Sequence, residues 1–105
     1  MDASDFIGYV GSPEIHDGEI VALNQAPNGL TVEIKSDLGA KIVITFSGVT
    51  NIKSHEPVGM MLYSLTEMRG DGVSRKFCFA NWDEDSQAFL EVDADDFICE
   101  VTHHA

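Results

Sequence analysis

Basic residues are few in this chain and are confined to its middle. Six Lys and Arg stand against eighteen Asp and Glu, for a net charge of -12, and all six lie between Lys35 and Lys76. Binding to a bare phosphate backbone requires cations, so this balance argues against a nucleic-acid partner. A basic protein is the partner that the charge favours. The alternative is that the acidic residues serve only to keep the protein soluble.

Long apolar runs are also lacking. The longest, such as Ile42–Ile44, have only a few residues, whereas roughly 20 are needed to span a bilayer. The start Met1–Asp5 has neither the basic region nor the apolar core of a secretory signal. We therefore expect a cytoplasmic protein with no membrane partner. A length of 105 residues, 44% of them hydrophobic, predicts one globular domain over residues 1–105.

Cysteine is scarce and shows no metal or redox motif. The two cysteines, Cys78 and Cys99, lie in apolar segments that resemble strands, and no Cys-x-x-Cys occurs. In a reducing cytosol they are expected to be buried free thiols. A disulfide between neighbouring strands remains the alternative.

Signatures of catalysis are missing as well. The chain has no Gly-x-Ser-x-Gly, no phosphate-binding glycine loop and no His-Glu-x-x-His. Its carboxylates are many, and no pair tuned for acid–base chemistry can be singled out. We expect a protein that is not an enzyme and that needs no cofactor.

What the chain does have is alternation of apolar and polar residues. The runs Leu30–Lys35 and Lys41–Phe46 alternate on either side of a turn and predict a hairpin. Strand-like runs recur about every 10 to 15 residues, which leaves no room for crossover helices. The prediction is a mainly β fold, an antiparallel barrel or sandwich of six to seven strands. The expected strands are residues 19–23, 30–35, 41–46, 60–68, 75–82, 88–94 and 97–102.

Two segments carry a helical pattern. Phe6, Ile7 and Val10 lie at helical spacing after several potential N-cap residues, which predicts a short N-terminal helix and lead-in within residues 1–14. Met60–Met68 fits a helix or a strand, and the strand is favoured because a turn and a clear strand follow. Tyr63 and the methionines of this segment fit either the core or an adaptable binding surface.

A small set of histidines and carboxylates could bind a metal or small ligand. His16 and Asp17 come just before an expected strand, and His55 lies in a loop-like segment. Imidazole and carboxylate together suit a divalent metal. Adjacent residues of an extended chain point to opposite faces, however, which makes joint ligation harder. The structural alternative is that Asp17-Gly18 forms a turn and His16 occupies a polar edge.

The acidic C-terminal third is the predicted partner-binding surface. Trp82 ends a strand beside an acidic turn, where an aromatic ring could bind a cationic partner or could instead cap the fold. The expected contact residues are Trp82, Asp83, Glu84, Asp85, Asp93, Asp95 and Asp96.

One part of the chain resembles a known group of proteins. The segment His16–Ile20, followed by alternating strands and then by Phe46–Val49, is similar to small bacterial domains of uncharacterised function, among them immunity protein 50-like domains. The likeness covers roughly Ile15 to Ile52, about a third of the chain. It implies an immunity-type protein that neutralises a toxin, and it implies no catalytic residues.

The function expected from these observations is a non-enzymatic, acidic protein-interaction module that docks a basic protein. If the resemblance holds, the module covers the basic active-site cleft of a toxin. Two alternatives remain. One is a small ligand- or metal-binding domain around His16, Asp17 and His55. The other is a homodimer that pairs an exposed sheet edge across a two-fold axis.

Overall fold

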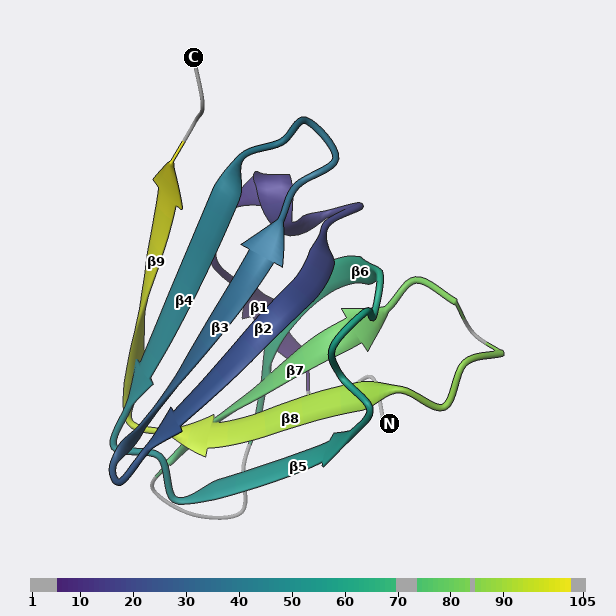
Figure 1. Cartoon of the computed structure of the whole chain (residues 1–105). Helices are drawn as coiled ribbons and strands as arrows, with labels where there is room; N and C mark the ends of the chain where they lie inside the picture. Colours follow the sequence, from purple (N-terminus) through teal and green to yellow (C-terminus); the bar gives the residue numbers. More distant parts are fainter. Residues whose placement is uncertain (1–5, 70–73, 84, 103–105) are drawn as a thin grey trace.

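Two antiparallel β-sheets lie face to face in the computed structural model, which describes residues 6–69, 74–83 and 85–102 (Figure 1). One sheet has five strands in the order β1-β6-β7-β8-β5, and the other has four in the order β2-β3-β4-β9. The sheets form a sandwich and do not close into a barrel. The predicted antiparallel, mainly β fold is therefore confirmed, with the sandwich as its architecture.

The five-stranded sheet is built around the meander β6-β7-β8. These strands pair antiparallel in chain order, and β1 and β5 pair with β6 and β8 as the two edges. The bounds are β1 Phe6–Tyr9, β5 Asn51–His55, β6 Leu62–Met68, β7 Arg75–Asn81 and β8 Phe89–Ala94.

The four-stranded sheet contains the hairpin that the alternation predicted. Strands β2 and β3 meet at Pro27 and Asn28, with Ala26 opposite Gly29, and β3 and β4 pair without interruption over seven residues. The last strand, β9, pairs with β4 and forms one edge of this sheet. The bounds are β2 Glu19–Ala26, β3 Gly29–Lys35, β4 Lys41–Ser47 and β9 Asp96–Thr102.

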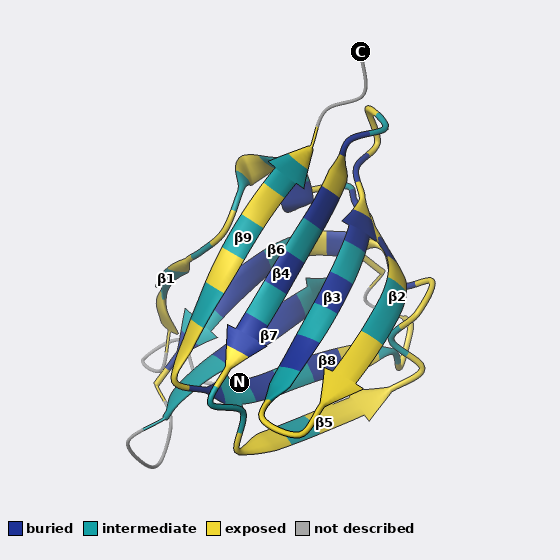
Figure 2. Cartoon of the chain, turned by 60° about the vertical axis from the view of Figure 1, so that its left-hand side comes forward, coloured by how far each residue is buried: buried dark blue, intermediate teal, exposed yellow. Residues whose placement is uncertain are grey.

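The alternation explains which side chains enter the core. Along β3 and β4 every second residue is buried, and Figure 2 shows these stripes between the sheets. The ring of Phe46 in one sheet lies 5.2 Å from that of Phe77 and 6.0 Å from that of Phe79 in the other. Full burial of such a side chain contributes about 1.5–3 kcal/mol, so these contacts hold the two sheets together.

The predicted N-terminal helix is wrong for the residues that the structure describes. Phe6–Tyr9 forms strand β1 instead, and the turn Pro13–Ile15 (η2) is a single 3-10 turn. Isolated short helices are marginal, whereas β1 gains hydrogen bonds along the edge of β6. Residues 1–5 of the predicted segment lie outside the described part. In the described ranges, no helix is long and apolar enough to cross a membrane.

Nine strands are present in the described ranges, where six to seven were expected. All seven expected strands occur, and β1 and β5 are the additions. Strand β5 falls in a segment that shows little alternation, because only Ile52 of its five residues is even half-buried. An edge strand with a solvated face leaves no apolar pattern by which the sequence could reveal it.

The segment Met60–Met68 contains strand β6, as favoured from the sequence. Met60 and Met68 are buried, whereas Met61 and Tyr63 are exposed. The two cysteines are unpaired, as expected, with Cys78 buried and Cys99 half-buried.

Candidate functional site

An apolar groove of about 500 Å³ opens where η2 crosses the edge of β6. Its walls come from the segment after β1, from η2 and from the first half of β6. A volume of this size falls within the range of small-ligand sites. The lining residues are Tyr9, Val10, Gly11, Ser12, Pro13, Ile15, His16, Tyr63, Ser64 and Leu65.

Local sequence explains how η2 is placed. Ser12 caps the turn by accepting a hydrogen bond from the backbone amide of Glu14 at 3.2 Å, and Pro13 occupies the first position. Asp17 follows with a φ of 67°, a left-handed conformation that aspartate tolerates. Its backbone amide donates to the carbonyl oxygen of Leu62 at 2.9 Å, which fastens the segment to β6.

The His16 ring is fixed against β6. Its Nδ1 lies 2.8 Å from the backbone carbonyl oxygen of Tyr63, so Nδ1 carries the proton and donates. The imidazole and the Tyr63 ring meet edge to face, with centroids 5.2 Å apart. The other ring nitrogen, Nε2, lies 3.6 Å from Oδ1 of Asp17, and the two form an ion pair when the ring is protonated.

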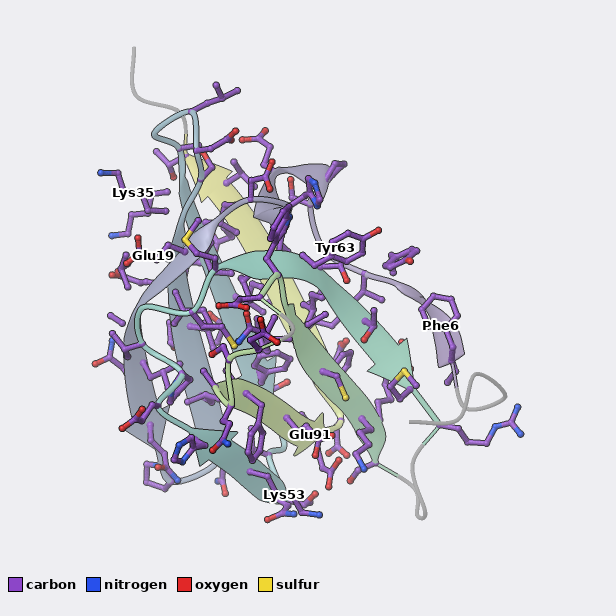
Figure 3. All side chains as sticks on the ribbon, turned by 90° about the vertical axis from the view of Figure 1, so that its right-hand side faces the viewer. Phe6, Glu19, Lys35, Lys53, Tyr63 and Glu91 are labelled. Atoms are coloured by element: carbon purple, nitrogen blue, oxygen red, sulfur yellow. The ribbon has the colours of Figure 1, made fainter. Side chains whose placement is uncertain are left out.

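The groove presents aromatic faces and hydrogen-bond acceptors to solvent. Tyr63 is 50% exposed and Tyr9 is 67% exposed. Figure 3 shows Tyr63 projecting from β6 on the same side of the molecule as Phe6 of β1. Phe6 in turn packs edge to face on Tyr9, with centroids 5.1 Å apart. An aromatic surface therefore runs from β1 to the groove.

A second cluster of aromatic and charged side chains lies toward the other end of β6. Arg75 donates to both carboxylate oxygens of Glu67, at 2.8 and 3.0 Å, and to Oδ1 of Asp96 at 3.0 Å. Its guanidinium carbon lies 5.0 Å from the ring centroid of Phe77 and 5.6 Å from that of Phe97. The hydrogen bond with Arg75 lowers the pKa of Glu67, and the same bond raises the pKa of Arg75. The cluster links both sheets.

Part of the predicted acidic surface lies in the loop between β7 and β8. Trp82, Asp83 and Asp85 are exposed there, Trp82 by 57%, so the tryptophan does not cap the sandwich. The amide of Asp83 donates to Asn81 Oδ1 at 2.8 Å, and that of Asp85 donates to Asp83 Oδ1 at 2.9 Å. These side-chain turns shape the loop. Glu84 lies outside the described residues.

The other predicted acids lie at the far end of β8. Asp93 is half-buried near the end of β8, Asp95 occupies the bend before β9, and Asp96 begins β9. Strand β8 has six residues, so about 20 Å of strand separates this group from the loop before β8. Asp96 is also bound to Arg75. The structure thus divides the predicted surface into two acidic groups.

The structure does not gather the three predicted metal ligands. His16 and Asp17 are neighbours at the groove, but His55 ends β5, where it pairs with Phe89 of β8. Three inter-strand spacings separate β6 from β5, roughly 14 Å. Over the described ranges, no three side chains of His, Cys, Asp or Glu are placed to hold a metal ion. His55 lies instead 4.0 Å from a carboxylate oxygen of Glu56.

The thiols are not poised for nucleophilic chemistry. Burial raises the pKa of Cys78 to about 12, and the nearby carboxylate of Glu91, 3.5 Å from Sγ, adds to the effect. Burial also raises the pKa of Cys99. A reactive cysteine needs a stabilised thiolate, and both sites favour the thiol.

Sequence reasoning found His16 and Asp17 but missed the aromatic side of the site. Tyr9 was assigned to a helix, and Tyr63 was left between core and binding surface. Their meeting depends on the pairing of β1 with β6, which joins residues more than fifty positions apart in the chain. The local sequence gives no signal for this pairing, because β1 is an edge strand with no fully buried residue.

Comparisons with protein-family models, with curated proteins and with solved structures find no significant match to this chain.

Proposed function

We propose that this protein is a non-enzymatic binding module for a positively charged protein partner. The observation that carries the proposal is the surplus of solvated carboxylates. In the described ranges no Asp or Glu is buried, and those in ion pairs with Lys or Arg are Glu33, Glu67 and Asp96. Exposed carboxylates outside these three pairs include those of Glu19, Asp37, Asp83, Asp85, Asp95 and Glu100.

The physical consequence is electrostatic steering. A net charge of -12 attracts a basic surface over a distance of about one Debye length, roughly 8 Å at physiological salt. Such steering raises association rates and weakens as salt is added. The resemblance of residues 15–52 to immunity protein 50-like domains supports a concrete form of this proposal, in which the partner is a basic toxin that the protein neutralises.

The test is capture of partners from lysate of the source organism at low and at high salt, with identification by mass spectrometry. The expected result is a stoichiometric basic protein that high salt releases. Two variants locate the surface: Asp83→Lys with Asp85→Lys in the loop before β8, and Asp95→Lys in the bend after it. Loss of capture in one variant alone assigns the surface to that group. Unchanged capture in both, or a salt-insensitive partner, would contradict the proposal.

A second candidate function is favoured by the groove itself. It is concave, mostly apolar and lined by polar groups from His16, Ser12 and Ser64, as small-ligand sites are. A thermal-shift screen of metabolites distinguishes the two functions. A small molecule that stabilises the wild type but not Tyr63→Leu supports the ligand site, and no such molecule in a broad screen counts against it.

A further inference from the structure

The Arg75 cluster shows what this chain uses to hold a guanidinium. Two aromatic rings lie over the planar cation at 5.0 and 5.6 Å, and two carboxylates receive its N–H groups. Aromatic faces attract a cation through the ring quadrupole, and carboxylates accept from the planar fork. The components of such a site are therefore aromatic faces together with carboxylate acceptors.

The groove beside η2 holds the same components at its surface. Tyr9 and Tyr63 supply exposed rings, and Asp17 supplies a carboxylate that lies 3.6 Å from Nε2 of the lining residue His16. None of the ten residues that line the groove is Lys or Arg. The ion pairs found for Asp17 and for His16 among the described residues are with each other.

We propose that this groove binds an arginine side chain of the partner. The proposal rests on the binding function proposed above and specifies where that partner is held. The guanidinium lies against the ring of Tyr63 and donates to the carboxylate of Asp17. The methylene stem lies on the apolar floor formed by Val10 and Leu65.

Arginine fits better than lysine for a geometric reason. The guanidinium is planar, stacks on aromatic rings and has five N–H donors, so it can reach acceptors in more than one direction at once. An ammonium is a compact, strongly hydrated point charge that stacks poorly. An anionic ligand is disfavoured because no Lys or Arg lines the groove and the carboxylate of Asp17 lies beside the lining residue His16.

The experiment is a titration of the ¹⁵N-labelled protein with N-acetyl-arginine amide, followed by amide chemical shifts. N-acetyl-citrulline amide, which has nearly the same shape without the charge, is the matched control, and N-acetyl-lysine amide tests the preference. We expect saturable shifts at His16, Tyr63 and Ser64 with arginine, weaker shifts with lysine and none with citrulline. Equal shifts with citrulline would overturn the role of the charge.

Two variants test the contacts, each with a matched control elsewhere. Tyr63→Leu removes a ring at the groove, and Phe89→Leu removes a ring of β8 that is 41% exposed and lies outside the groove. Asp17→Asn removes the carboxylate while keeping a residue that tolerates positive φ, and Asp37→Asn removes an exposed carboxylate in another turn. The groove variants should weaken arginine binding about threefold to tenfold, and the controls should not.

The outcomes separate this site from the broader function. Shifts confined to the loop residues Trp82 and Asp83 would overturn the groove as the arginine site while leaving a cationic partner in place. Shifts at the groove without any basic partner in the capture experiment would keep the site and overturn the broader function. If Tyr63→Leu fails to fold, Asp17→Asn and the citrulline control test the site instead. Equal binding of the arginine and citrulline amides would then overturn the proposal.

Discussion

The two ends of strand β6 use similar chemistry for different purposes. Near its end, Glu67 and the neighbouring Phe77 and Phe97 receive Arg75 from the chain itself. Near its beginning, Tyr63 and His16 line a groove without a Lys or Arg in its lining, and Asp17 lies beside His16. One site is complete within the fold, and the other offers its components to solvent.

Burial explains why only the first site is structural. The Glu67 side chain is 14% exposed and that of Arg75 is 37% exposed, so the pair loses much of its water on folding and its charges depend on each other. The groove tyrosines are half exposed or more. Water can fill the groove without leaving a buried charge unpaired, so the fold tolerates the groove without an occupant. The two sites therefore differ in burial: the Glu67 carboxylate is largely withdrawn from solvent, and the groove tyrosines remain open to it.

The largest effect is expected from removing the internal cation. Arg75→Ala leaves the carboxylate of Glu67 without its partner and removes the contacts with two rings. We expect the free energy of unfolding to fall by about 2 kcal/mol, less than the 3–5 kcal/mol of a fully buried pair because Arg75 is 37% exposed. Urea denaturation measures the loss.

The matched control for that change is Lys41→Ala. Lys41 pairs with Glu33 at 3.0 Å on the outer face of the four-stranded sheet, where both groups meet solvent. Exposed pairs contribute about 0–1 kcal/mol, so this change should be nearly neutral. Equal losses in the two variants would mean that burial does not distinguish the Arg75 site.

Acid should weaken the internal site selectively. Arg75 holds the pKa of Glu67 below its ordinary value of 4.5. Between the lowered pKa and 4.5 the unfolded chain binds more protons than the folded chain, so stability falls as the pH drops through that window and is fully present above it. Glu67→Gln should therefore lower the free energy of unfolding more at pH 7 than at pH 3. Urea unfolding at both values, with Asp37→Asn as control, tests this, and an equal cost at both would contradict it.

The smallest expected effect comes from supplying the groove with a cation. Ser64 lines the groove, so Ser64→Arg places a guanidinium within reach of the rings of Tyr63 and Tyr9. The introduced guanidinium competes with the ligand at an effective concentration on the order of millimolar. We therefore expect binding of N-acetyl-arginine amide to weaken about fivefold. Ser54→Arg on the exposed edge strand β5 adds the same charge away from the groove. Equal weakening in both variants would point to net charge and not to occupancy.

Much of the fold could be predicted because the strands carry strong alternation. Residues 30–35 and 41–46 each bury one face, and the structure pairs them in the expected hairpin. The two strands that the sequence did not predict share one property. Strands β1 and β5 lie at edges, where few side chains are buried, so their sequences carry little pattern. Phe6 and Tyr9 are close in the sequence and pack together in a strand, although their spacing also fits a helix.

The candidate site could be predicted only in part. His16 and Asp17 drew attention as polar residues beside a strand. The contact of His16 with Tyr63 joins residues 47 positions apart and lies at an irregularity in the β6–β7 pairing between Leu62 and Ser64. Alternation alone does not reveal such a bulge. Asp83 and Asp95 were predicted to share one binding surface, and the structure places them at opposite ends of β8.

The most direct measurement of the central claim is the set of intermolecular nuclear Overhauser effects between protein and N-acetyl-arginine amide. We predict contacts from the side-chain methylenes of the ligand to the ring protons of Tyr63 and to the methyl groups of Leu65 and Val10. Contacts to Trp82 alone, or to no aromatic ring at ligand saturation, would contradict the claim that the groove receives an arginine from outside.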